Sequence, residues 1–178
     1  MPYAVVFYFD PQKSAPLERV THELARTKVA PYLHSAEIPP HVTLAIYDDL
    51  DCQPCEKKIA GLAKETRGFD LNFVYLGLFR NESKVVFLGA TVTLELLSYH
   101  QQIHNLLKKD AEHPWELYQP GKWVPHCTLA TDFSEDKTMQ VIRLCGKLQL
   151  PIDIRVASMG VVQFEPITPL YSYHFTST

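Results

Sequence analysis

The sequence predicts an α+β protein made of two similar lobes, each an α-β-α-β-β unit, with two mostly antiparallel sheets that face each other across a central cleft. Apolar runs of strand length alternate along the chain with stretches of helical periodicity. The hexapeptide PHVTLA at residues 40–45 returns as PHCTLA at residues 125–130, so five of six positions are identical at an offset of 85 residues. Such a repeat indicates a duplicated unit whose two copies are related by approximate symmetry.

Length and composition are typical of one folded domain. The chain has 178 residues, of which 46% are hydrophobic and 21% are charged. These values are ordinary for a globular protein with a sizeable core. We expect a single domain over residues 1–178, with lobe 1 at about residues 1–91 and lobe 2 at about residues 92–178.

The elements expected in the first half are a strand at 3–9, a helix from Ser14 to about Val29, a strand from His41 to about Ile46, a helix at 54–66, and a hairpin of strands 69–79 and 84–90 that turns at 80–83. Residues 3–9 are apolar and rich in β-branched and aromatic side chains. Ser14 is the predicted N-cap, with Pro16 in the first turn. Residues 31–40 form a proline-bounded loop, and the strand from His41 is expected to end at residues 48–51.

The elements expected in the second half are a helix at 93–109, an irregular stretch at 110–124, a strand from His126, a helix at 135–144 with Ser134 as N-cap, and strands near 152–162 and 170–175. The irregular stretch carries two prolines and two tryptophans, and loops of this length are more often functional than connecting. Phe79 and Phe164 each lie 38 residues after the motif histidine of their half, which supports the duplication.

The repeated motif supplies the groups that acid/base chemistry at phosphorus needs. Side chains alternate faces along a strand, so His41 and Thr43 point one way, as do His126 and Thr128 in the second copy. If the two strands meet across the cleft, one imidazole can take a proton from the nucleophile while the other protonates the leaving oxygen. The threonine hydroxyls would donate hydrogen bonds to the phosphate. One copy alone would be weak support, because the tripeptide is short.

With these two motifs the sequence resembles the two-histidine phosphoesterase superfamily, in particular its 2′-5′ RNA ligase-like and cyclic phosphodiesterase members. Residues 40–44 (PHVTL) and 125–129 (PHCTL) match the two defining motifs. The resemblance implies a metal-independent enzyme without a cofactor that acts on 2′,3′-cyclic phosphate ends, 2′-5′ linkages or related nucleotides. It carries both histidines over as catalytic residues, His41 as general acid and His126 as general base, and the near-symmetry of the repeat leaves that order open.

Four aromatic residues are candidates for substrate binding. Tyr118 and Trp123 lie in the polar stretch before the second motif, where an exposed ring can stack on a base. Phe79 and Phe164 are related by the repeat and could line the two ends of the cleft. Ordinary core packing stays an open alternative for all four.

Positive charge near the predicted site is sparse. Several RNA-processing relatives place a basic residue two positions after the leucine of the second motif, where this chain has Thr131. Lys122, Arg80 and Lys84 could supply the charge instead, although lysine and arginine more often occupy solvated surface positions.

The charge pattern limits the class of partner. The net charge is −3, and the chain has no cluster of five or more Lys or Arg, so an electrostatic grip on a long nucleic-acid backbone is not indicated. We expect a small nucleotide phosphodiester or an RNA terminus as partner. Neither a signal segment nor an apolar run long enough for a bilayer is present, so we expect a cytoplasmic monomer without membrane contact.

Two other motifs, and one alternative use of the cleft, point to different functions. Cys52 and Cys55 form a CxxC at a predicted helix start, as in thiol oxidoreductases, although the acidic neighbours at 49 and 51 oppose a thiolate. His100 and His104 have the i, i+4 spacing of a metal pair, but no third ligand is evident and we expect no metal site. The same cleft could also hold a nucleotide or RNA end without turning it over.

Overall fold

The computed structural model describes residues 1–80, 83–164 and 167–176. Its strands are β1 (Tyr3–Phe9), β2 (His41–Leu50), β3 (Phe69–Phe79), β4 (Val85–Ala90), β5 (Ala111–Pro114), β6 (His126–Ala130), β7 (Ile152–Gln163) and β8 (Thr168–His174). Its helices are α1 (Pro11–Arg26), α2 (Tyr32–Ser35), α3 (Cys52–Glu65), α4 (Leu94–Leu107) and α5 (Thr138–Cys145), with short 3-10 turns η1 (Glu116–Tyr118) and η2 (Glu135–Lys137). The turn predicted at residues 80–83 includes two residues outside the described ranges.

The strands form one sheet in the order β5-β2-β1-β7-β3-β4-β6, with β8 also paired to β7. Every strand pairing is antiparallel, which confirms the predicted mixture of helices and antiparallel strands. The expected two sheets are joined into one because β7 is 12 residues long. Residues 152–156 of β7 pair with β3, while residues 158–163 pair with β8.

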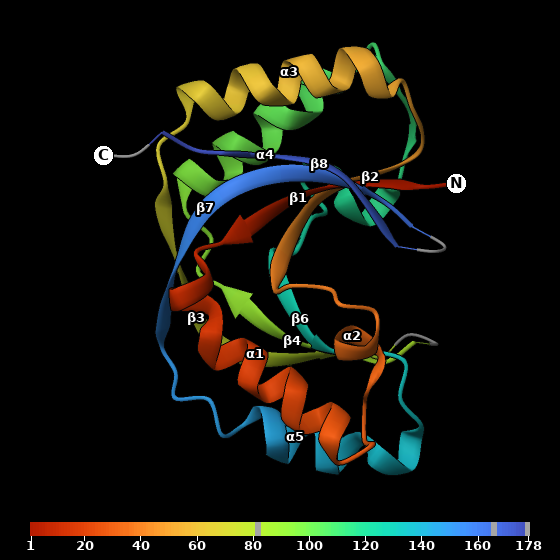
Figure 1. Ribbon diagram of the computed structural model, residues 1–178, viewed down its shortest axis with the longest axis vertical. Coiled ribbons are helices and arrows are strands. Elements are labelled where there is room, and N and C mark those ends of the chain that lie inside the picture. The colour runs from red at the N-terminus through yellow and green to blue at the C-terminus, as the bar shows by residue number, and fades with distance from the viewer. Residues whose placement is uncertain (81–82, 165–166, 177–178) are drawn as a thin grey trace.

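The two halves of the sheet do not follow the two halves of the chain. In Figure 1, α3 and α4 cover the half that contains β2, β7 and β8, whereas α1 and α5 lie at the half that contains β4 and β6. The C-terminal strand β7 lies between β1 and β3, so strand pairing crosses the predicted lobe boundary near residue 91. The division into lobes at that residue stays a prediction.

The core follows from the alternation of side chains along the strands. Val42 and Leu44 of β2 are fully buried, as are Cys127 and Leu129 of β6. Together with the apolar faces of α1, α3, α4 and α5 they form one continuous hydrophobic cluster, and burial of this kind is the dominant stabilising term in folding. Among the described residues, no helix is long and apolar enough to cross a membrane.

Helix α1 begins earlier than the sequence predicts. Asp10, not Ser14, is the N-cap, because its Oδ1 accepts hydrogen bonds from the backbone N–H groups of Gln12 at 2.9 Å and Lys13 at 3.0 Å. Ser14 lies inside the helix and is buried. Proline at the first helical position, here Pro11, suits such a start, because its missing N–H would be unpaired there in any case.

Two other boundaries also differ from the prediction. The strand β2 does not end near Ile46 but continues to Leu50, because β5 pairs with residues 47–50. The stretch at 110–124 therefore contains a short strand and a 3-10 turn. Ser134 precedes η2, and α5 proper starts only at Thr138.

The two candidate N-caps of α1 can be compared directly. Asp10→Ala removes the acceptor for two helix N–H groups and is expected to lower the free energy of unfolding by about 1 kcal/mol. Ser14→Ala removes a hydroxyl whose hydrogen bond to the carbonyl of Pro11 is long, at 3.4 Å, and should cost less. Urea unfolding of both variants measures the difference. A larger loss in Ser14→Ala would contradict the assigned N-cap.

Candidate active site

The two motif strands meet although they lie towards opposite ends of the sheet. β2 is the second strand from one end and β6 is the last strand at the other. The sheet curls, so β2 and β6 come into contact near the centre of the molecule (Figure 1). This contact brings the two predicted His-x-Thr units to one place.

The side chains of the motifs alternate between core and cavity. His41, Thr43, His126 and Thr128 are half-buried, while the residues between and after them are fully buried in the core. Residues i and i+2 of a strand share a face, so each histidine lies on the same side as its threonine. His41 and both threonines line one cavity, and His126 with Thr128 lines the adjoining one.

Both imidazoles are held by the same local hydrogen bond. Nδ1 of His41 lies 2.9 Å from the carbonyl oxygen of Pro39, and Nδ1 of His126 lies 2.7 Å from that of Val124. A carbonyl oxygen only accepts, so each Nδ1 carries the proton and donates it. In the neutral ring Nε2 is therefore the free acceptor. Each histidine thus presents Nε2 as the nitrogen available for proton transfer.

The surroundings lower the pKa of both histidines. Burial lowers the pKa of His41, the hydrogen bond to Pro39 partly offsets this effect, and the nearby His126 adds a smaller lowering. Burial also lowers the pKa of His126. The effect of His126 on the pKa of His41 is that of one titratable group on a neighbour of the same charge type.

Two cavities flank the motif residues. One, of about 550 Å³, includes His41, Thr43 and Thr128 among its lining residues. The other, of about 920 Å³, includes His126 and Thr128. Both volumes lie in the range usual for small-molecule sites, about 300–1,000 Å³. Val85, Tyr118 and Thr128 belong to both cavities, so the two spaces adjoin at the second motif.

The four predicted aromatic residues differ in position. Phe79 and Tyr118 are half-buried and line the larger cavity. The Phe79 ring lies with its centroid 5.1 Å from that of His126, at 84°. Phe164 lines the smaller cavity, and its ring packs edge-to-face on that of Trp115 with the centroids 5.7 Å apart. Trp123 lines the larger cavity but is only 9% exposed, so most of its ring surface is already packed against protein.

Trp123 joins the two motif strands. Its indole N–H donates a hydrogen bond of 2.9 Å to the backbone carbonyl of Thr43 in β2. Trp123 itself lies three residues before His126 in the chain. One face of the indole stacks on the imidazole of His100 at 4.1 Å and 2°. This contact fixes the segment that leads into β6.

His100 and His104 hold the same segment from α4. Nε2 of each ring lies 2.9 Å from the carbonyl oxygen of Tyr118, and the hydroxyl of Tyr47 lies 3.3 Å from Nδ1 of His104. Both Nε2 atoms are therefore used as donors to protein. Within the described residues, no group of three or more His, Cys, Asp or Glu is placed to hold a metal ion.

The predicted cations are paired with acids. Lys122 forms an ion pair with Glu116, and both Arg80 and Lys84 lie within 4.0 Å of Glu135. Lys122 and Arg80 also line the larger cavity, so they remain within reach of a bound anion there. Thr131 lines the smaller cavity.

Tyr8 is a site residue that the sequence does not predict. It lies in the apolar strand at 3–9, but it is half-buried and lines the smaller cavity. It is the direct cross-strand partner of His41, and the two rings lie 6.3 Å apart. Strand register sets this neighbour, and an isolated sequence does not contain that register.

The CxxC cysteines lie apart from this site. Both are free thiols at the start of α3, and Cys55 is buried. Burial, reinforced by Asp110, raises the pKa of Cys55 to about 12. A thiol oxidoreductase needs a thiolate with a lowered pKa, so the surroundings of Cys55 oppose that function.

A curled antiparallel sheet with two converging His-x-Thr strands is the arrangement expected of the two-histidine phosphoesterase superfamily that the sequence resembles. The sequence profile of the 2′-5′ RNA ligase superfamily matches residues 55–166, more than half of the chain and including the second motif. The chain belongs to this superfamily, which confirms the predicted resemblance and makes it a protein of the phosphoesterase and RNA ligase class.

Solved structures share the fold over nearly the whole chain. LigT of E. coli complexed with 3′-AMP gives a TM-score of 0.62 at 19% identity over 99% of both chains. TT0787 of Thermus thermophilus gives 0.62 at 17% identity over 98% of both chains. Usb1 of Kluyveromyces marxianus gives 0.54 at 13% identity over 95% of this chain and 97% of that one. None of the curated proteins compared with the chain matches it in sequence.

The buried His100 predicts a pH-dependent stability. Burial, followed by the nearby His104, lowers the pKa of His100 to about 4, compared with 6.5 for an unperturbed histidine. Between these values the unfolded chain binds more protons, so stability is fully present above pH 6.5 and falls as the pH drops towards 4. The loss from this residue is about 3 kcal/mol at most.

The variant His100→Gln isolates this contribution. The amide of Gln can still donate to the carbonyl of Tyr118 but does not titrate. We expect urea unfolding between pH 7 and pH 4 to show a smaller loss of stability in the variant than in the unmodified protein. Parallel pH curves would show that His100 keeps an ordinary pKa.

Proposed function

We propose that the protein is a metal-independent phosphodiesterase that hydrolyses 2′,3′-cyclic or 2′-5′ nucleotide phosphoesters by two-histidine general acid/base catalysis. The observation that carries the proposal is the matched pair of imidazoles. Each is fixed through Nδ1 by a carbonyl two residues earlier, so that Nε2 is the nitrogen free for proton transfer. Two such nitrogens supply both proton transfers that displacement at phosphorus requires.

This geometry supports a role for each motif residue, and the family resemblance supplies the order of the two histidines. The phosphate lies between the histidines, and the hydroxyls of Thr43 and Thr128 donate hydrogen bonds to its non-bridging oxygens. Nε2 of His126 takes a proton from the attacking water, and Nε2–H of His41 protonates the oxygen that leaves. The negative charge of the bound phosphodiester favours the imidazolium form of one ring, which offsets the effect of burial.

The nucleoside part of the substrate is assigned to the cavities. The larger cavity offers half-buried rings, Phe79 and Tyr118, beside His126, and aromatic side chains stack on bases with little sequence preference. LigT has been solved with 3′-AMP, a nucleotide of the kind that forms when a 2′,3′-cyclic phosphate is opened. This likeness supports a small nucleotide or an RNA terminus as substrate. A cytoplasmic location and a monomeric state stay predictions.

The central test measures hydrolysis of 2′,3′-cyclic nucleotides with EDTA present. Turnover is expected in the unmodified protein. His41→Gln and His126→Gln are each expected to lower kcat by about 10²- to 10⁴-fold, the usual contribution of a general acid or base. The matched control is His22→Gln, since His22 is an exposed histidine on α1 that lines neither cavity.

Three outcomes would count against the proposal. Turnover that EDTA abolishes, or full activity in both motif variants, would exclude the two-histidine mechanism. Tight binding of the cyclic nucleotide without product over hours would instead favour a nucleotide-binding module on the same fold.

The lowered pKa values also predict the pH optimum. Activity requires one histidine protonated and the other neutral, so kcat/KM is bell-shaped between the pKa values of the free protein. Both values are lowered from 6.5. The maximum of kcat/KM is therefore expected below pH 6.5, measured with a cyclic nucleotide at constant ionic strength. An optimum above pH 7.5 would mean that burial does not dominate the ionisation of this pair.

A further inference from the structure

We propose that the Tyr8 hydroxyl is a further substrate-binding group, which donates a hydrogen bond to the phosphoryl group on the His41 side of the site. The inference rests on the proposed function and adds a residue outside the two repeated motifs. It starts from strand register: Tyr8 of β1 lies directly opposite His41 of β2. Side chains of directly opposed residues project from the same face of a sheet.

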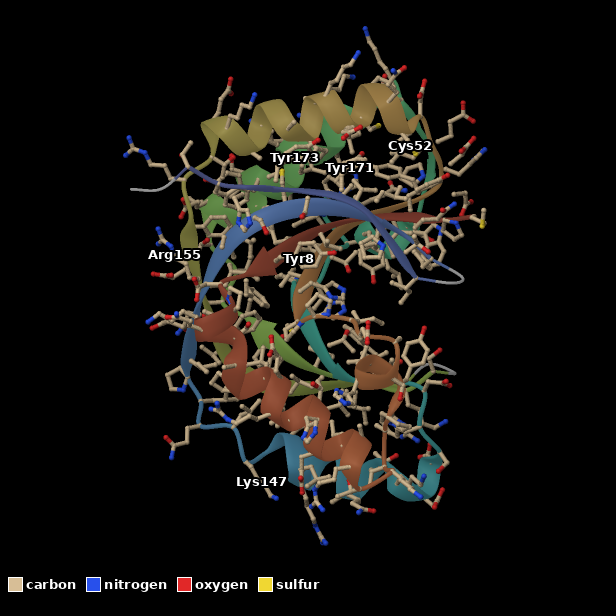
Figure 2. The ribbon with its side chains drawn as sticks, in the orientation of Figure 1. Tyr8, Cys52, Lys147, Arg155, Tyr171 and Tyr173 are labelled. Carbon is tan, nitrogen blue, oxygen red and sulfur yellow. The ribbon has the colours of Figure 1, made fainter. Side chains whose placement is uncertain are left out.

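Tyr8 opens onto the cavity that holds the predicted phosphate ligands. The smaller cavity is lined by Tyr8 together with His41, Thr43 and Thr128. Figure 2 shows Tyr8 on β1, near the middle of the molecule and beside the space between its upper and lower halves. Tyr8 is the one polar residue that β1 contributes to this lining, since its other contributions are Ala4 and Val6.

The ring of Tyr8 is fixed by packing. It lies against the small buried cluster of Ala4, Val6 and Ile46. Gly160 belongs to β7, which pairs with β1 on the side opposite to β2. A Cβ atom at Gly160 would lie only 3.1 Å from Cε2 of Tyr8, so the ring packs closely over this glycine. A ring held in this way keeps its hydroxyl in one region at little further entropic cost.

The hydroxyl itself is not used by the protein. Across residues 1–80, 83–164 and 167–176, no side chain or backbone group forms a hydrogen bond with the Tyr8 hydroxyl. A half-buried tyrosine usually finds such a partner. Burial raises the pKa of Tyr8, so the phenol stays protonated at neutral pH and is able to donate. A bound phosphate oxygen would complete its hydrogen bonding.

In the described residues, strand register gives the second motif no counterpart of Tyr8. The cross-strand partner of His126 is Gly89, which carries no side chain. The rings that contact His126 are those of Phe79 and Phe87, with centroids at 5.1 and 5.2 Å. The nearly symmetric site therefore has a tyrosine opposite His41, whereas the rings in contact with His126 are phenylalanines. Tyr8 would orient the phosphoryl group with respect to the two histidines.

The test compares Tyr8→Phe with the unmodified protein. The variant keeps the packed ring and removes only the hydroxyl. Loss of one hydrogen bond to a charged group is expected to lower kcat/KM for a 2′,3′-cyclic nucleotide by about 10- to 100-fold. Affinity for inorganic phosphate, measured by calorimetry, should weaken with it, whereas affinity for an unphosphorylated nucleoside should not change.

The matched control is Tyr173→Phe. Tyr173 lies between β8 and α3 (Figure 2), where its hydroxyl donates to Glu56 at 2.7 Å, and it lines neither cavity. This variant should keep both phosphate affinity and turnover. Thermal unfolding of both variants checks that the fold is intact.

The outcomes separate this inference from the proposed function. Equal phosphate affinity and equal turnover in Tyr8→Phe and the unmodified protein would overturn the role of Tyr8 and leave the two-histidine mechanism standing. An unmodified protein without turnover would overturn the mechanism. In that case the phosphate affinity of Tyr8→Phe would still show whether Tyr8 binds phosphate, because this affinity is measured without catalysis.

Discussion

The contact between strands β2 and β6 is the constraint on which the site depends. These strands do not pair with each other; each pairs with a different neighbour, and the curl of the sheet brings them together. The indole N–H of Trp123 then links the segment before β6 to the backbone of Thr43 in β2. Without this closure the two histidines would belong to separate surfaces. The stack of His100 on Trp123, and the two imidazoles that share the carbonyl of Tyr118, support the same closure from α4.

The motif residues were predictable because their signals are local or repeated. Alternation along a strand is enough to put His41 beside Thr43, and the exact repeat spacing relates them to His126 and Thr128. The hydrophobic runs also located every long strand to within a few residues. Asp10 was missed as an N-cap because Ser14, Pro16 and the apolar spacing after them formed a rival start signal.

Other features depend on contacts that a single sequence does not reveal. The extension of β2 to Leu50 exists because β5 pairs with it, and β5 has little strand character of its own. Tyr8 faces His41 through register, and Trp123 is covered by a histidine from a distant helix. Trp123 was predicted to be able to stack on a base, yet its ring is largely enclosed by protein. Contacts between residues far apart in the chain decide how these side chains are placed, and the pattern of residues along the chain does not reveal such contacts.

The position of β7 has a consequence for how the protein folds during its synthesis. This strand is near the C-terminal end of the chain but lies between β1 and β3, and it joins the two halves of the sheet. During synthesis the first motif emerges long before the strand that completes its sheet, and contacts between distant segments slow folding. A break near the predicted lobe boundary would therefore leave each fragment with exposed strand edges that pair with the other fragment in the intact sheet.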